Sequence, residues 1–84
     1  MENVRMTTNA ELLGVVQKNS KNGNTYYIFN LLDENGTPFS LCCKDSKLTN
    51  NLEKRGVYIF ELAYKEDRFG KKIEIVGVSP WKKH

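Results

Sequence analysis

The segment Asn24–Lys44, NTYYIFNLLDENGTPFSLCCK, predicts two β-strands folded back on each other. Residues Thr25–Leu32 are almost all aromatic, β-branched or aliphatic, which suits a pleated, half-buried surface. Asp33-Glu34-Asn35-Gly36 supplies the turn, because Asn and Gly tolerate the positive φ that tight hairpins require. Phe39–Cys43 forms a second short apolar strand. Since an isolated hairpin is marginal in water, the rest of the chain must close a core around it.

Three further strands flank this hairpin. Glu11–Lys18 is apolar on both faces, and its interior Gly14 indicates a bulge or a sharp bend. Val57–Lys65 and Lys71–Val78 supply the fourth and fifth strands. Alternation predicts an inner face for Tyr58, Phe60, Leu62 and Tyr64, and it places Ile73 and Ile75 opposite Lys72 and Glu74.

A short helix is expected within Asp45–Gly56. Leu48 and Leu52 are four residues apart, as on one helix face, and a glycine stands where helices usually stop. Asn50 followed by Glu53 resembles a capping box, which would start the helix late and limit it to one or two turns.

Composition limits the chain to one small domain with a modest core, since it has only 84 residues. We expect residues 1–10 to be a flexible lead-in, part of which could pair as an extra edge strand, residues 11–81 to be the domain, and residues 82–84 to be a basic tail. No apolar run approaches the ~20 residues of a membrane span, and the polar N-terminus lacks the apolar core of a signal peptide.

The adjacent cysteines Cys42 and Cys43 do not form the spaced framework of a disulfide-rich or zinc-binding protein. Neighbours on a strand point to opposite faces, so we interpret both as reduced thiols of a cytoplasmic protein. The sole histidine, His84, is terminal, and no carboxylate pair, nucleophile motif or phosphate-binding glycine loop is present. The sequence therefore predicts neither an enzyme nor a cofactor or metal site.

The order strand, strand, strand, short helix, strand, strand, with a glycine-kinked first strand, resembles an OB-fold. The junction LEKRGVYIFEL, at Leu52–Leu62, is similar to that fold's passage from helix to fourth strand. The resemblance covers roughly Glu11–Trp81 and implies an all-β, five-stranded Greek-key barrel with a short helix between strands three and four. The nearest functional likeness is to the short single-stranded DNA-binding proteins of phages and conjugative plasmids. The basic ending WKKH departs from the larger bacterial proteins of this kind, whose flexible acidic tail ends in phenylalanine.

In OB-folds the ligand crosses strands two and three between the first and fourth inter-strand loops. Here these loops are Lys18–Asn24 and Glu66–Lys72, and the strand positions are Tyr26, Ile28, Asn30, Ser40, Cys42 and Lys44. The resemblance thus implies nucleic-acid contacts from Lys18, Lys21, Tyr26, Ile28, Lys44, Arg68, Phe69, Lys71, Lys72 and Trp81.

Two features of this set can be argued from the residues themselves. Tyr26 shares a strand face with Asn30, whereas Tyr27, Phe29 and Leu31 form an unbroken apolar set, so Tyr26 is the candidate for base stacking unless a bulge reverses the faces. Each aromatic also has a purely structural interpretation. Tyr26 could be a rim residue, Phe69 could fold onto the barrel, and Trp81 could cover its open end.

The net charge of +3 is weak evidence for a nucleic-acid partner by itself, because such binding needs clustered cations. Together with the resemblance, it leads us to expect single-stranded DNA binding with little sequence preference, with a possible homo-oligomer. The alternatives are an OB-fold protein-interaction module of a phage or conjugation complex, and single-stranded RNA binding.

Overall fold

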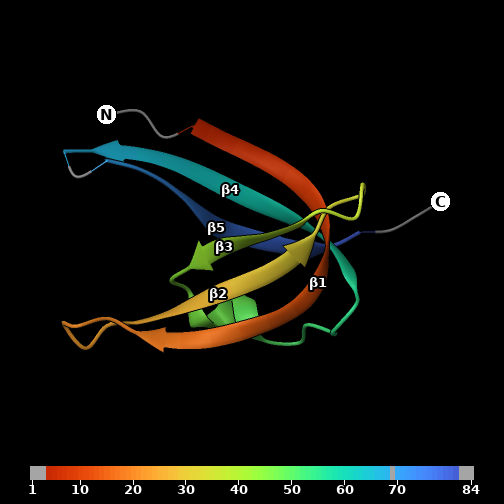
Figure 1. Ribbon diagram of the computed structural model, residues 1–84, viewed down its shortest axis with the longest axis horizontal. Coiled ribbons are helices and arrows are strands. Elements are labelled where there is room, and N and C mark those ends of the chain that lie inside the picture. The colour runs from red at the N-terminus through yellow and green to blue at the C-terminus, as the bar shows by residue number, and fades with distance from the viewer. Residues whose placement is uncertain (1–3, 69, 82–84) are drawn as a thin grey trace.

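The computed structural model describes residues 4–68 and 70–81 and shows a closed five-stranded barrel (Figure 1). The elements are β1 (Val4–Asn19), β2 (Thr25–Leu32), β3 (Pro38–Cys43), the 3-10 helix η1 (Ser46–Thr49), β4 (Val57–Asp67) and β5 (Gly70–Pro80). Neighbouring strands follow the order β1-β2-β3-β5-β4, and β4 pairs again with β1. This confirms the predicted all-β barrel with a short helix between the third and fourth strands. Within the described residues, no helix is long and apolar enough to cross a membrane.

β1 is longer than the sequence predicted and serves two neighbours. Its first half pairs with β4 and its second half with β2, and Glu11 has a partner in both. The register against β2 shifts between Leu12 and Gly14, which confirms the bulge expected at the interior glycine. Of the two alternatives for residues 1–10, strand pairing holds for residues 4–10, since they continue the same strand along β4.

The β2–β3 hairpin forms as predicted, but its turn depends less on Asn35 than expected. The Asp33 carboxylate accepts hydrogen bonds from the backbone N–H groups of Asn35, at 2.9 Å, and Thr37, at 2.8 Å. Gly36 has φ +80°, whereas Asn35 is not among the residues with positive φ. The turn therefore has a left-handed backbone only at Gly36, and hydrogen bonds from the backbone to the Asp33 side chain stabilise it in place of a left-handed Asn35.

The core lies between the inner faces of the strands. Phe29 and Leu31 of β2 are fully buried, and Phe29 meets Phe60 of β4 edge to face with ring centroids 6.1 Å apart. Tyr27 packs against this cluster from the same face of β2. Such a contact between aromatic edges and faces adds about 0.5–1.5 kcal/mol beyond the burial of the rings.

The helix begins earlier than the capping-box pattern predicted. Asp45 caps η1, and its side chain accepts a hydrogen bond from the Lys47 N–H at 2.9 Å, while Asn50 follows the helix instead of starting it. Gly56 does not end a helix; a glycine is required here because there is no room for a Cβ atom. A Cβ at this position would lie 2.9 Å from Cε2 of Tyr58 and 3.1 Å from the Glu53 carbonyl oxygen.

The β4–β5 pair differs from simple alternation because the register shifts between Glu61 and Leu62. Tyr58, Phe60 and Leu62 join the core as predicted, and Ile75 lies in it as well. Tyr64, which was expected on the inner face, is the cross-strand partner of Ile73 further along the hairpin, and both lie outside the core cluster. Ile73 is 42% exposed, because this part of the hairpin extends past the residues that fill the barrel.

Figure 1 shows what gathers at each end of the long axis. The loop between β1 and β2 and the β4–β5 hairpin lie toward one end, at the left. The β2–β3 turn and the C-terminal end of the described chain lie at the other. The parallel pairing of β3 with β5, through Cys42 and Glu74, completes the closure. At this contact β3 and β5, which are far apart in sequence, form one continuous surface.

Candidate nucleic-acid interface

A continuous groove crosses the outer surface near the β1–β2 loop. Two adjoining hollows, of about 390 and 460 Å³, share Tyr26 and Lys44 in their linings. We call them together the Tyr26 groove. Its lining comprises Ser20, Asn22, Asn24, Thr25, Tyr26, Cys42, Lys44, Lys72, Ile73 and Glu74. The groove therefore runs from the β1–β2 loop, past the ends of β2 and β3, to β5.

Tyr26 faces this groove because β2 keeps its regular alternation. The ladder with β3 runs without a register shift from Tyr27 to Leu32, so the bulge that could have exchanged the faces lies in β1 instead. Tyr27 packs against the core, and Tyr26 lines the groove as a half-buried ring. The orientation expected from the apolar set on the other face is confirmed.

Glu74 lies in the groove where β3 meets β5, and it is only 6% exposed. Its carboxylate bridges two cations. Lys44 Nζ is 3.2 Å from Oε1, and Lys65 Nζ is 3.4 Å from Oε2. Burial alone would raise the pKa of Glu74, but the hydrogen bonds and charges of Lys44 and Lys65 outweigh it and hold the pKa below its usual value.

The cations of the groove are therefore not equivalent. Glu74 neutralises part of the charge of Lys44, whose side chain is 64% exposed and keeps a free side toward solvent. Lys72 is exposed, and no ion pair joins it to any other described residue. Lys18 is the β1 partner of Tyr26 in the ladder, which adds a third positive charge beside the ring.

The two thiols differ in access. Cys42 is half-buried and lines the groove, and its pKa is raised by burial and by the nearby Glu74. Cys43 is fully buried in the core, and burial likewise raises its pKa. Both are free, as expected from their adjacency. Over residues 4–68 and 70–81, no three His, Cys, Asp or Glu side chains gather as they would around a metal ion.

The structure brings together only part of the residue set predicted for binding. Tyr26, Lys44 and Lys72 line the groove, and Lys18 and Ile28 adjoin it through their pairings with Tyr26 and Cys42. Lys21 is exposed in the β1–β2 loop and Arg68 in the β4–β5 turn. Lys71 is the ladder partner of Glu66, and as the neighbour of Lys72 on β5 it points to the opposite face of the strand. Phe69 lies outside the described residues.

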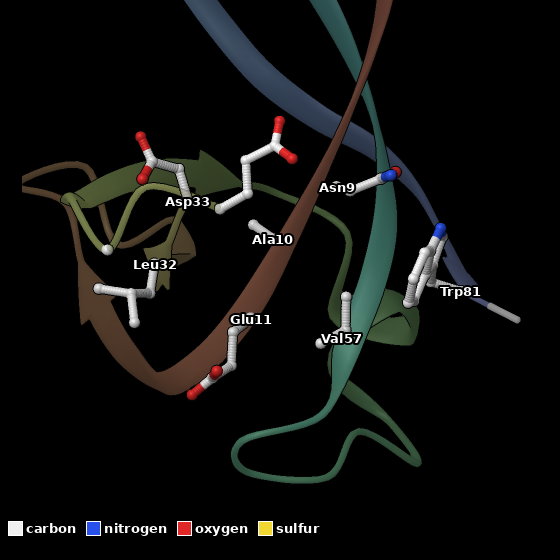
Figure 2. A pocket seen from close by; sticks show the side chains of 9 residues that line it. Asn9, Ala10, Glu11, Leu32, Asp33, Val57 and Trp81 are labelled. Atoms are coloured by element: carbon white, nitrogen blue, oxygen red, sulfur yellow. The ribbon is translucent and has the colours of Figure 1, made fainter. Parts of the chain in front are cut away.

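Trp81 is the member of the set that lies elsewhere. Its N–H donates to the Val57 carbonyl at 3.4 Å, and its ring lines a hollow with Asp33 and Glu34 of the β2–β3 turn (Figure 2). It therefore belongs to the opposite end of the barrel from the β1–β2 loop (Figure 1).

Sequence reasoning missed Glu74 and Lys65 as neighbours of the predicted binding face. The alternation of β5 already placed Glu74 on the side of Lys72, and Lys65 is the ladder partner of Lys72. What the sequence lacked was the pairing of Glu74 with Cys42, which joins strands that are not consecutive.

Comparison with known proteins gives a structural likeness alone. A scan against protein-family models found no match, and a search of curated proteins found none. Among solved structures, the chain is similar to the second OB-fold domain of replication protein A from Methanococcus maripaludis, solved by NMR in solution. The TM-score is 0.57 at 16% sequence identity, and the match covers 96% of this chain and 87% of that chain. The fold is an OB-fold.

Proposed function

We propose that this chain binds single-stranded DNA in the Tyr26 groove with little sequence preference and catalyses no reaction. The observation that carries the proposal is a half-buried tyrosine ring flanked by Lys44 and Lys72 in a groove on an OB-fold barrel. Bases stack on such rings whatever their identity, and cations beside the ring hold the phosphates.

The groove carries a chemical group suited to each interaction that the proposal needs. A base on Tyr26 would gain about 1–3 kcal/mol from stacking. The phosphates on either side of that base would meet Lys44 and Lys72 in the groove, with Lys18 alongside. At the loop end, Ser20, Asn22 and Asn24 offer hydrogen-bonding groups to the sugar and phosphate oxygens without selecting a base.

The structural neighbour supports DNA as the ligand, because it is a domain of a protein named for replication. We place the chain with the short phage or conjugative-plasmid type of single-stranded DNA-binding protein, acting in the cytoplasm with Cys42 and Cys43 reduced. A groove this short holds few nucleotides, so we propose that copies assemble as a homo-oligomer to gain avidity. Native mass spectrometry with and without oligo-dT tests the assembly.

Fluorescence anisotropy with labelled oligo-dT, oligo-U and a matched duplex, at several salt concentrations, tests the binding itself. We expect preference for oligo-dT, with log affinity falling against log salt by ~0.7 per phosphate contact. Tyr26→Ala should weaken binding by roughly five- to 150-fold, which corresponds to one stacked base, and Tyr26→Phe should retain most of it.

A lysine pair provides the matched control for charge. Lys44→Ala should weaken binding and lower the salt slope, whereas Lys54→Ala, an exposed lysine outside the groove lining, should do neither. If the duplex bound as tightly as oligo-dT, the binding would be explained by general attraction between opposite charges and not by recognition of a single strand. Stronger binding to oligo-U would make RNA the ligand. Absence of binding at low salt would refute the proposal and favour the protein-interaction module.

A further inference from the structure

Among the described residues, one edge of the first half of β1 has no strand partner. Val4–Ala10 pairs with β4 on one side, but the ladder with β2 begins only at Glu11. In an antiparallel ladder, alternate residues direct their N–H and C=O groups to opposite sides, so every second residue here points away from β4. An unpaired row of this kind is a template for another strand.

The space beside this edge is hollow. A cavity of about 470 Å³ lies between Thr7–Asn9 of β1 and Asp33–Asn35 of the β2–β3 turn. A second, of about 380 Å³, continues it across β1 to Val57 and Trp81 and shares Asn9, Asp33 and Glu34 with the first. We call the two together the β1-edge trough. Figure 2 shows Leu32 and Asp33 on one side of β1, and Val57 and Trp81 on the other.

The charge of the trough is opposite to that of the Tyr26 groove. Its lining includes Glu11, Asp33 and Glu34 but no lysine, arginine or histidine among the described residues. Glu11 is paired with Arg55 at 2.5 Å, and one Asp33 oxygen accepts the hydrogen bonds of its own turn. Glu34 is exposed and forms no ion pair with any other described residue.

We propose that the β1-edge trough binds an extended, basic segment of a partner protein, which adds as a strand to the free edge of β1. Main-chain hydrogen bonds to the edge would provide affinity, and lysine or arginine side chains facing Glu34 and Asp33 would provide selectivity. Trp81, 39% exposed at the far end of the trough, offers an apolar surface for a neighbouring side chain. A second copy of this chain fits less well, because symmetric pairing of two such edges would bring two acidic surfaces together.

This inference stands apart from DNA binding, because the trough and the groove share no lining residue. The test is selection of a displayed random octapeptide library on the full chain, followed by titration of the selected peptides. Trp81 is the sole tryptophan, so its fluorescence reports on peptide side chains that reach across β1 to the far end of the trough.

We expect selected peptides to be enriched in Lys and Arg and to shift the Trp81 emission. Glu34→Lys replaces the attraction between Glu34 and a basic peptide by a repulsion, so it should lower the affinity for the selected peptides by roughly three- to tenfold. Glu66→Lys makes the same charge change on the β4–β5 hairpin and should leave the peptide affinities unchanged. A strand directs every second amide N–H to each of its edges. N-methylation of the odd positions of a peptide and of the even positions should therefore differ: one set should abolish binding, and the other should leave it intact.

Three results would overturn the proposal. The first is a selection that yields no basic peptides. The second is binding that Glu34→Lys leaves intact, or that N-methylation weakens equally at the odd and at the even positions. The third is displacement of the peptides by oligo-dT, which would place them in the Tyr26 groove instead.

Discussion

Replacement of Glu74 by glutamine should tighten the binding of single-stranded DNA. The carboxylate lines the Tyr26 groove where β3 meets β5, and it holds Lys44 and Lys65 at 3.2 and 3.4 Å. A phosphate that binds Lys44 must therefore compete with Glu74 for the same ammonium group. Glu74→Gln keeps the shape of the side chain and removes the competing charge.

The size of the effect follows from exposure and distance. Because the Lys44 side chain is 64% exposed, its pair with Glu74 is screened by water and is worth about 0.2–1 kcal/mol. A phosphate on the far side of Lys44 Nζ would lie about 6 Å from the carboxylate, where like charges repel by roughly 0.7–1 kcal/mol in a water-like dielectric. Because Lys44 keeps its pair with Glu74 in this arrangement, only the repulsion is removed, which gives about 0.7–1 kcal/mol, or roughly three- to fivefold in affinity.

The assay is anisotropy with oligo-dT at low salt, after circular dichroism has shown that the variant is folded. Glu34→Gln is the matched control, since it makes the same change in net charge at the opposite end of the barrel. It should alter affinity less than twofold. Glu74→Gln binding that is equal to or weaker than that of the unaltered chain, in a folded protein, would refute the idea that Lys44 serves both Glu74 and the DNA.

Three other outcomes are expected, two from the groove and one from the packing around Gly56. As pH falls through the lowered pKa of Glu74, the stability that its ion pairs contribute should be lost, while oligo-dT affinity rises; in Glu74→Gln both changes should be smaller, because that carboxyl is absent. Saturating oligo-dT should slow alkylation of Cys42 several-fold by mass spectrometry, and Cys43 should react only on unfolding; unprotected Cys42 would place the DNA elsewhere. Gly56→Ala should lower the free energy of unfolding in urea by about 1–3 kcal/mol, because its Cβ would crowd Tyr58, whereas Gly14→Ala has open space and should change it little.

Much of the fold could be predicted because it depends on neighbours in sequence. The apolar alternation of Thr25–Leu32 placed Phe29 and Leu31 in the core and Tyr26 on the outside, and Gly14 marked the bulge. Predictions failed where a local pattern had competing outcomes. The capping box at Asn50 was displaced by Asp45, which satisfies the Lys47 N–H one turn earlier.

The sequence by itself thus determined the strands, the hairpin and the outward face of Tyr26. Only the tertiary structure placed Glu74 beside Lys44, carried Trp81 to the far end of the barrel, and left the edge of Val4–Ala10 open. The physical reason is that side-chain alternation is set within each strand, whereas the contact between β3 and β5 is set by how the whole barrel closes. The charge balance of the groove depends on that closure.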